Sequence, residues 1–363
     1  MVQRVSRRTL VGQMLAAGAA APFLSIGTAA AQRVKAPAAP LSDADYITRY
    51  VHPELRAMAR QYAAMGGMMP AFTAANLPMM RKGMEAQAVK KLAAPAIETR
   101  QIPGGRGQPP VTVHVINAKP GARRPVIVHM HGGGYIIGNA TQNYADLQGI
   151  CQALDCAAVS IDYRLAPEIT YAGSIEDNYA SLKWTHANAA QLGIDPARIA
   201  VMGESAGGGH AAILAIVARD RSEVPIAFQC LIYPMIDDRT GSTRQPAAHI
   251  GRLLWTRERN TFAWRSFLGQ APGAPRVPAL AAPARVANLA GLPPAFIGVG
   301  SIDLFYDEDL AYAQRLNAAG VTAELIVVPG AFHGFDGAEV PVAKRFHAAK
   351  VDALRRGLGV GPI

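Results

Sequence analysis

The sequence is poor in cysteine, in acidic residues and in charge as a whole, and each shortage excludes a class of protein. Three cysteines in 363 residues are too few for a disulfide scaffold. Charged residues make up 17% of the chain against 50% apolar residues, which excludes an intrinsically disordered protein. Lysine and arginine exceed aspartate and glutamate by 36 to 26, but the basic residues are spread singly or in pairs, without a nucleic-acid-binding motif. We therefore expect no nucleic-acid partner.

The first 31 residues contain no acid and resemble an export signal of the twin-arginine type. Arg7 and Arg8 precede an uncharged stretch rich in alanine and glycine, and an A-x-A cleavage site ends at Ala31. An uncleaved membrane helix is the alternative, but Pro22 interrupts a weak apolar run. We predict a Tat-type signal peptide over 1–31, export to the periplasm or the medium, and no stable membrane insertion.

The mature chain divides into a short linker, a helical segment and a long region of mixed structure. Residues 32–42 are rich in alanine and proline and read as the linker. Helical patterns near 43–65 and 77–93 predict an N-terminal cap over 43–93, and residues 94–363 are expected to form one large α/β domain. Short β-rich segments are expected in that domain at 97–102, 111–118, 125–130, 156–162, 198–203, 228–233, 295–300 and 323–328.

These segments predict an α/β fold. Several are apolar throughout, as expected for strands covered on both faces, and they alternate with helical segments, which indicates a mostly parallel sheet of eight strands flanked by helices. The first two strands are joined by a Gly-rich turn and should form an antiparallel hairpin at the sheet edge. Residues 235–294 break the alternation, and an insertion of this length is usually functional. We expect it to join 43–93 in a cap over the sheet edge.

Gly203-Glu204-Ser205-Ala206-Gly207 follows an expected strand and precedes an apolar helix. This strand–turn–helix context is that of a nucleophile elbow, in which small neighbours allow a strained turn to present the serine hydroxyl at a helix N-terminus. A helix-capping serine in a Gly-rich turn is the alternative. His131-Gly132-Gly133-Gly134-Tyr135 follows another strand, and its glycines suit main-chain N–H groups that bind an oxyanion. A phosphate-binding loop is the alternative, but neither nucleotide-loop spacing is present.

A serine nucleophile needs a base, and the base needs an orienting acid. Among nine histidines, His333 lies in a loop after the last strand, whereas His131 belongs to the glycine loop and is expected to support it. Asp303 directly follows the strand at 295–300, and Asp307 and Asp309 are expected to cap or solvate the next helix. The order Ser205, Asp303, His333 is the α/β-hydrolase order.

With these motifs, the sequence resembles the hormone-sensitive-lipase-like bacterial esterases of the α/β-hydrolase fold over about residues 110–350. The resemblance rests on the His-Gly-Gly-Gly loop, the segment Asp162-Tyr163-Arg164-Leu165-Ala166-Pro167-Glu168, the serine elbow, Asp303 with Asp307-Glu308, and His333-Gly334-Phe335. It implies Ser205, Asp303 and His333 as the catalytic triad. It also implies the amides of Gly133, Gly134 and Ala206 as the oxyanion hole, and no metal or organic cofactor. The sequence departs from the family at Glu204, Leu304 and Ala282-Pro283.

Several charged and sulfur-containing residues admit two interpretations. Arg164 and Glu168 look catalytic beside an apolar strand, but the family resemblance makes them structural braces. Seven of 12 methionines fall between residues 58 and 84 and either line an acyl pocket or pack the cap helices. We assign Tyr135, Met79, Met80 and Met84 to substrate binding.

The sequence thus predicts a serine carboxylesterase for short- to medium-chain esters, acting through an acyl-enzyme on a small-molecule ester. A non-catalytic ligand-binding protein on the same fold, or an amidase or peptidase with the same triad, remains the alternative.

Overall fold

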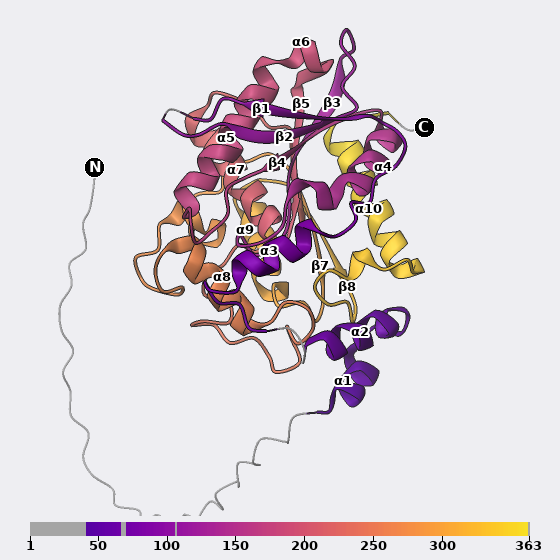
Figure 1. The fold of residues 1–363 in the computed structure, drawn as a ribbon, viewed down its shortest axis with the longest axis vertical. Helices are drawn as coiled ribbons and strands as arrows, with labels where there is room; N and C mark the ends of the chain where they lie inside the picture. Colours follow the sequence, from indigo (N-terminus) through magenta and orange to yellow (C-terminus); the bar gives the residue numbers. More distant parts are fainter. Residues whose placement is uncertain (1–40, 67–69, 106, 362–363) are drawn as a thin grey trace, which may run out of the picture. The chain divides into compact units, whose positions relative to one another are not determined.

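The centre of the protein is an eight-stranded sheet in the order β1-β2-β4-β3-β5-β6-β7-β8 (Figure 1). This computed structural model describes residues 41–66, 70–105 and 107–361; the predicted signal peptide and the linker up to residue 40 lie outside it. Among the strands of the described residues, β2 alone runs opposite to the others, and the expected antiparallel β1–β2 hairpin forms the edge. The strands are β1 Ile97–Ile102, β2 Val111–Ile116, β3 Arg124–Met130, β4 Ala157–Asp162, β5 Ile194–Glu204, β6 Phe228–Ile232, β7 Ala295–Gly300 and β8 Ala323–Val328.

The apolar strands separate two cores, one on each face of the sheet. Successive side chains of a strand point to opposite faces, so Val126 and Val128 of β3 pack into one core and Ile127 packs into the other. All of β7 is buried, as its uninterrupted apolar run predicted, and all of β3 is buried as well, including Arg124 and His129. The fold is the expected α/β-hydrolase arrangement.

Helices cover both faces. Helices α4 (Tyr144–Leu154) and α10 (Pro341–Gly357) pack on one face, and α5 (Tyr171–Ala187), α7 (Ala206–Arg221) and α9 (Tyr306–Ala318) pack on the other (Figure 1). The smaller helical turns are α6 Ala189–Leu192, η1 Pro53–Leu55, η2 Ala140–Asn143, η3 Ala279–Ala281, η4 Pro283–Arg285 and η5 Phe335–Gly337.

The N-terminal segment contains three helices rather than the two that the sequence pattern suggested. The first predicted helix is split into α1 (Asp43–Tyr50) and α2 (Arg56–Gly66), because Pro53 lacks an N–H and holds the preceding His52 in an extended conformation. The second, α3 (Leu77–Glu85), ends well before residue 93. Val89 and Leu92 beyond it are exposed, so no apolar packing sustains a longer helix.

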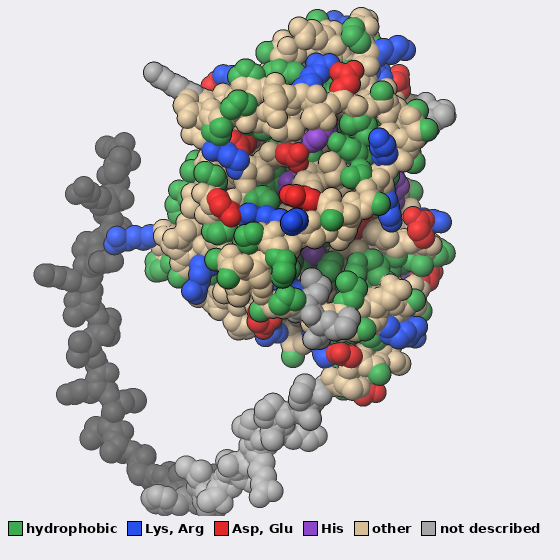
Figure 2. Space-filling model, in the orientation of Figure 1, with side chains coloured by type: hydrophobic (Ala, Val, Ile, Leu, Met, Phe, Trp, Pro, Cys, Tyr) green, Lys and Arg blue, Asp and Glu red, His purple; other side chains and the backbone are tan. Residues whose placement is uncertain are grey.

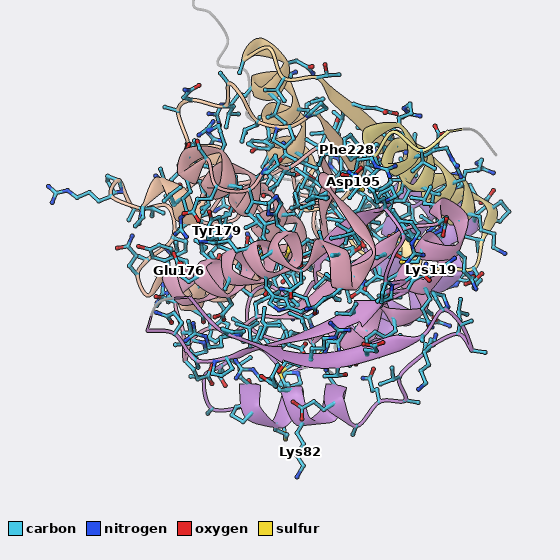
Figure 3. All side chains as sticks on the ribbon, turned by 90° about the horizontal axis from the view of Figure 1, so that it is seen from above. Lys82, Lys119, Glu176, Tyr179, Asp195 and Phe228 are labelled. Carbon is cyan, nitrogen blue, oxygen red and sulfur yellow. The ribbon has the colours of Figure 1, made fainter. Side chains whose placement is uncertain are left out.

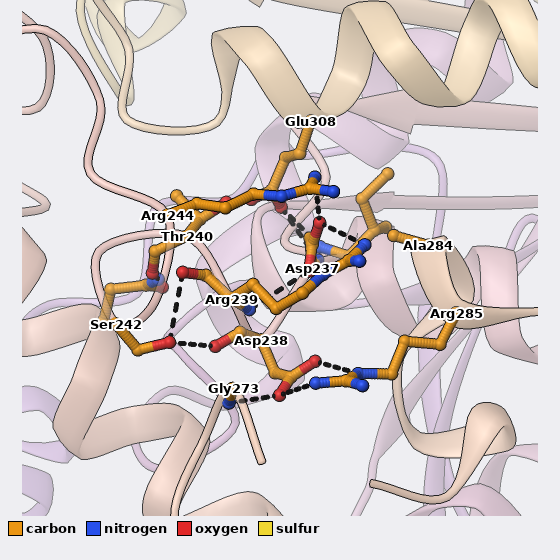
Figure 4. Close-up of polar contacts among 12 residues, drawn as sticks. Asp237, Asp238, Arg239, Thr240, Ser242, Arg244, Gly273, Ala284, Arg285 and Glu308 are labelled. Carbon is orange, nitrogen blue, oxygen red and sulfur yellow. Dashed lines mark hydrogen bonds and ion pairs between the residues drawn. The ribbon is translucent and has the colours of Figure 1, made fainter. Parts of the chain in front are cut away.

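The segment 235–294 carries α8 (Arg257–Leu268) and is held in one conformation by buried ion pairs between its own residues (Figure 4). Glu308 of α9 attaches it to the body by accepting hydrogen bonds from the amides of Ile236 and Asp237. Asp237 pairs with Arg239 and Arg244, and Asp238 pairs with Arg285, both carboxylates being fully buried. Buried charges that are paired and hydrogen-bonded in this way hold a segment in one conformation at the cost of desolvation.

Outside the core, acidic and basic side chains are interspersed on the face drawn in Figure 2, without a patch of one sign. All three cysteines are free and buried, in agreement with the expectation that they pack as small apolar residues. In the described ranges, no helix is long and apolar enough to span a bilayer.

Candidate active site

The site is built on the carboxyl ends of parallel strands. The loop that begins at His131 follows β3, Ser205 follows β5, Asp303 follows β7 and His333 follows β8. Parallel strands end at the same edge of a sheet, so four chain segments that are distant in sequence meet there. The register pairs Met130 with Gly203, which sets the glycine loop beside the serine turn.

Ser205 sits in a strained turn between β5 and α7. Its φ of 59° and ψ of −121° are unfavourable for a residue with a side chain. The turn passes so close to β3 that a Cβ on Gly207 would lie 2.0 Å from the carbonyl oxygen of Met130. A glycine is therefore required there, and the turn holds the hydroxyl at the N-terminus of α7.

Ser205, His333 and Asp303 form a continuous hydrogen-bonded chain. The Oγ of Ser205 lies 2.9 Å from Nε2 of His333, and Nδ1 of His333 lies 2.9 Å from Oδ2 of Asp303. Asp303 is fully buried, and its other oxygen accepts a hydrogen bond from the amide of Phe305. With the Nδ1 proton donated to Asp303, Nε2 is free to accept the serine proton. The structure thus brings together the three residues that the sequence selected.

Aromatic side chains fix the orientation of the His333 ring. The ring centroids of Tyr233 and Phe305 lie 4.6 Å and 5.1 Å from that of His333, both in edge-on contact. Trp255 lies 6.3 Å away on the cavity side. None of these three was selected from the sequence, because no spacing rule connects them to the triad.

The glycine loop presents main-chain amides next to the serine. In the described part of the chain, the N–H groups of Gly133 and Gly134 have no hydrogen-bond acceptor, and Ala206 is the first residue of α7, whose N–H has no partner within the helix. Gly134 has a φ of +60°, and a Cβ there would lie 2.2 Å from the Trp255 ring. The three amides are available for an anionic oxygen.

His131 supports the loop, as expected. Its ring stacks on Tyr163 at 4.3 Å and its Nδ1 donates to the Gly132 carbonyl at 2.7 Å. Burial lowers the pKa of His131 to about 4, so the ring is neutral at pH 7.

A cavity of about 910 Å³ opens over Ser205 and has two chemically different sides. The volume suits a small-molecule ligand. The apolar side is formed by Tyr62, Phe72, Ile137, Leu254 and Trp255. The polar side is formed by Asn143, Asp146, Glu204, Asp336, His347 and Lys350.

The polar side contains charged groups around Lys350, which is almost completely buried. Lys350 donates to Asp146 at 2.9 Å, and Tyr233 donates to Asp336 at 2.7 Å. Burial by itself lowers the pKa of Lys350, but the carboxylates of Asp146, Glu204 and Asp336 outweigh it and leave that pKa above its ordinary value. Lys350 therefore stays charged, and it is a structural cation of the cavity.

The predicted substrate residues lie elsewhere. Tyr135 is buried, stacks on Phe267 at 3.9 Å and donates to the Met235 carbonyl, so it belongs to the core under the glycine loop. None of Met79, Met80 and Met84 lines the cavity, and Met79 is 66% exposed. Their assignment to substrate binding is corrected: α3 faces the body through Leu77, and its methionines lie away from the cavity.

The charged residues near the glycine loop are structural. Arg164 makes a bidentate ion pair with buried Asp177. Glu168 pairs with Arg81 of α3, whose guanidinium also donates to the carbonyls of Ile136 and Ala166 at 2.8 Å and 2.7 Å. Sequence reasoning missed Arg81, which links the cap to the glycine loop.

The acids after Asp303 differ from one another. Asp307 is exposed in the first turn of α9, as expected. Asp309 is fully buried, which corrects the expectation that it caps or solvates the helix, and burial raises its pKa well above the usual range. Among the residues that the structure describes, no group of His, Cys, Asp and Glu is arranged to hold a metal ion.

Comparisons with known proteins agree with this geometry. A family model described as the alpha/beta hydrolase fold matches residues 127–337. Carboxylesterase NlhH of Mycobacterium tuberculosis is 38% identical over 244 residues, which are 64% of this chain and 74% of the relative. Esterase LipI of the same organism is 37% identical over 241 residues, which are 65% and 72% of the two chains.

Solved structures are similar over a longer range. A bacterial heroin esterase superposes with a TM-score of 0.76 at 37% identity and covers 85% of this chain and 98% of its own. Esterase LipW from Mycobacterium marinum superposes with a TM-score of 0.74 at 35% identity, covering 86% and 96%. The chain therefore belongs to the hormone-sensitive-lipase-like branch of the α/β-hydrolase family.

Proposed function

We propose that the protein is a serine carboxylesterase that hydrolyses short- to medium-chain esters through an acyl-enzyme. His333 removes the proton from Ser205 as Oγ attacks the ester carbonyl, and Asp303 stabilises the imidazolium that forms. The amides of Gly133, Gly134 and Ala206 bind the oxyanion. His333 then returns the proton to the leaving alcohol. In the second half of the reaction His333 takes a proton from water as it attacks the acyl-enzyme, and then returns that proton to Oγ of Ser205 as the acid leaves.

One observation carries this proposal: both hydrogen bonds of the Ser205–His333–Asp303 chain are 2.9 Å long, and the serine faces a cavity of ligand size. The family relatives that are named as esterases support the same chemistry. The limited volume supports short and medium acyl chains, because each added CH₂ contributes about 0.8 kcal/mol only while there is room to bury it.

The test is Ser205→Ala, assayed with 4-nitrophenyl acetate and butyrate. We expect the rate to fall by roughly 10⁴ or more while the circular-dichroism spectrum is unchanged. The wild-type protein should release a burst of nitrophenol equal to its active sites and should be labelled at Ser205 by a fluorophosphonate. A mutant with near-normal turnover would overturn the proposed nucleophile.

We also propose that the protein is exported by the twin-arginine route and released by cleavage after Ala31. The twin arginines, the uncharged stretch and the A-x-A site support this. Periplasmic protein should begin at Gln32. Export that persists when Arg7 and Arg8 are both replaced by lysine would count against the route.

A further inference from the structure

Arg259 occupies an unusual position at the mouth of the active site. It lies in the first turn of α8 and is half-buried. It lines the catalytic cavity and also a neighbouring hollow of about 370 Å³, which shares Tyr62, Phe72 and Leu254 with it. A ligand that extends from Ser205 toward solvent on the apolar side passes Arg259.

The guanidinium of Arg259 has few partners. Its Nη1 donates a hydrogen bond to the Leu254 carbonyl, and its Cζ lies 5.7 Å from the centroid of the Phe72 ring. No carboxylate pairs with it in the described ranges, and the segments outside them contain no aspartate or glutamate. Glu258, which directly precedes Arg259, is exposed and makes no ion pair with it.

The other arginines around this mouth are satisfied. Arg252 pairs with Asp43 at 2.9 Å and lies over the Tyr46 ring, and Arg257 donates to the carbonyls of Pro246 and Ala247. The dipole of α8 disfavours a cation in the first turn of the helix, so the helix does not stabilise the charge of Arg259. Burial lowers the pKa of Arg259, and the charge of the neighbouring Glu258 offsets this only in part.

A short series of ring contacts joins Arg259 to the triad. Phe72 lies beneath Arg259, its centroid is 6.1 Å from that of Trp255, and Trp255 is 6.3 Å from His333. An ester with its carbonyl at Ser205 therefore meets an apolar wall first and a positive group beyond it.

Building on the proposed ester hydrolysis, we propose that Arg259 is an anion subsite that binds a carboxylate carried by the substrate at a distance from the scissile ester. The planar fork of a guanidinium matches a carboxylate through two parallel hydrogen bonds. The preferred substrates are then esters of the half-ester type, with one ester group and one free acid, rather than purely aliphatic esters.

The experiment uses two matched probe pairs, because the carboxylate can sit on either part of the ester. Mono-4-nitrophenyl glutarate and its neutral methyl ester place the charge on the acyl part. 4-Acetoxybenzoate and methyl 4-acetoxybenzoate place it on the alcohol part. The quantity compared is the ratio of kcat/KM for the charged and the neutral member of each pair, so the intrinsic reactivity of the esters cancels between variants.

We expect Arg259→Gln to lower this ratio about tenfold for one pair, and Arg259→Lys to lower it less, because lysine keeps the charge but loses the fork. Arg252→Gln is the matched control, and its ratio should equal that of the wild type, since Arg252 is already paired with Asp43. In the wild type, added salt should slow the charged ester and spare the neutral one.

The outcomes separate this subsite from the proposed function. Equal ratios in wild type and Arg259→Gln, with neutral esters still hydrolysed, would overturn the subsite and leave the esterase intact. A wild type that hydrolyses none of the four probes would overturn the esterase itself. If Arg259→Gln fails to fold, the salt dependence decides, and a charged ester that is insensitive to salt rejects the subsite.

Discussion

The two segments that form the apolar side of the cavity are stabilised by ion pairs of different kinds. Segment 235–294 supplies Leu254, Trp255 and Arg259, and buried carboxylate–arginine pairs connect its own residues to one another (Figure 4). Segment 43–93 supplies Tyr62 and Phe72, and its ion pairs are largely exposed to solvent, as at Asp43, whose side chain is 64% exposed.

This difference teaches that the two segments have different roles at one site. Removing one partner of a buried pair is strongly destabilising, so segment 235–294 is internally rigid. Exposed pairs contribute little, so segment 43–93 is held mainly by apolar packing of residues such as Leu55 and Leu77 and by the Arg81 contacts. Regions of lower local stability are the ones in which cavity shape can change.

The largest expected effect is on stability. Asp238→Asn removes the charge opposite Arg285, whose side chain is only 15% exposed, and should lower the free energy of unfolding by about 3 kcal/mol. The matched change in the other segment, Asp43→Asn opposite Arg252, should cost less than about 1 kcal/mol. Urea unfolding at pH 7 measures both. Equal losses would contradict the distinction between the segments.

The next effect is catalytic and concerns the contact between α3 and the glycine loop. Arg81→Met removes the hydrogen bonds to Ile136 and Ala166 and should lower kcat about tenfold with little change in KM, because loosened oxyanion donors weaken transition-state binding. Affinity for a trifluoromethyl ketone should fall in parallel. Lys82→Met is the control, since Lys82 points away from the molecule (Figure 3). If Arg81→Met lowers the melting temperature but leaves kcat unchanged, Arg81 has a structural role only.

A smaller effect is expected on acyl-chain preference. Phe72→Ala enlarges the apolar side of the cavity and should shift the kcat/KM optimum toward longer 4-nitrophenyl esters, measured from acetate to laurate, by about 0.8 kcal/mol for each CH₂ newly buried. Met79→Ala should leave the profile unchanged, because Met79 is exposed. A shift in Met79→Ala, without one in Phe72→Ala, would restore the methionine pocket that the sequence suggested.

The smallest effect is the dependence of stability on pH, which has opposite signs at two carboxyls of the body: Glu168 contacts segment 43–93, and Glu308 contacts segment 235–294. The hydrogen bonds from Arg81 hold the pKa of Glu168 below its usual range, so this pair stabilises above the unfolded-state pKa and is lost as pH falls through the folded-state value. Burial, with the charge of Asp237, raises the pKa of Glu308, whose carboxyl accepts the amides of Ile236 and Asp237. Its contribution therefore declines as pH rises above the unfolded-state pKa.

Melting curves from about pH 3 to 9 test both signs, because the window for Glu168 lies below its ordinary pKa and the window for Glu308 lies above it. Glu308→Gln, which stays neutral, should gain stability relative to wild type as pH rises. Glu168→Gln should lose stability relative to wild type at neutral pH and approach it in acid. Parallel pH profiles for wild type and Glu308→Gln would mean that Glu308 is ionised in the folded protein.

Local pattern was enough for most of the secondary structure. Seven of the eight strands lie within two residues of the predicted segments; β5 begins at Ile194 instead of 198, because its first residues are mixed in polarity and only their pairing with Arg124 makes them a strand. The single helix predicted at 43–65 is two helices, because a continuous periodic pattern does not show the interruption at Pro53.

The sequence by itself determined the catalytic residues that follow the carboxyl ends of the strands. A tight turn around Ser205 needs glycines at fixed positions, and the order of Ser205, Asp303 and His333 follows from the strands they terminate, so these residues are readable locally. The walls of the cavity were decided only by tertiary structure. Phe72, Trp255 and Arg259 are ordinary residues of two remote segments, and Met79 resembles them in sequence. Only the packing of those segments on the sheet determines which side chains face Ser205, because burial depends on contacts across the chain and not on neighbours within it.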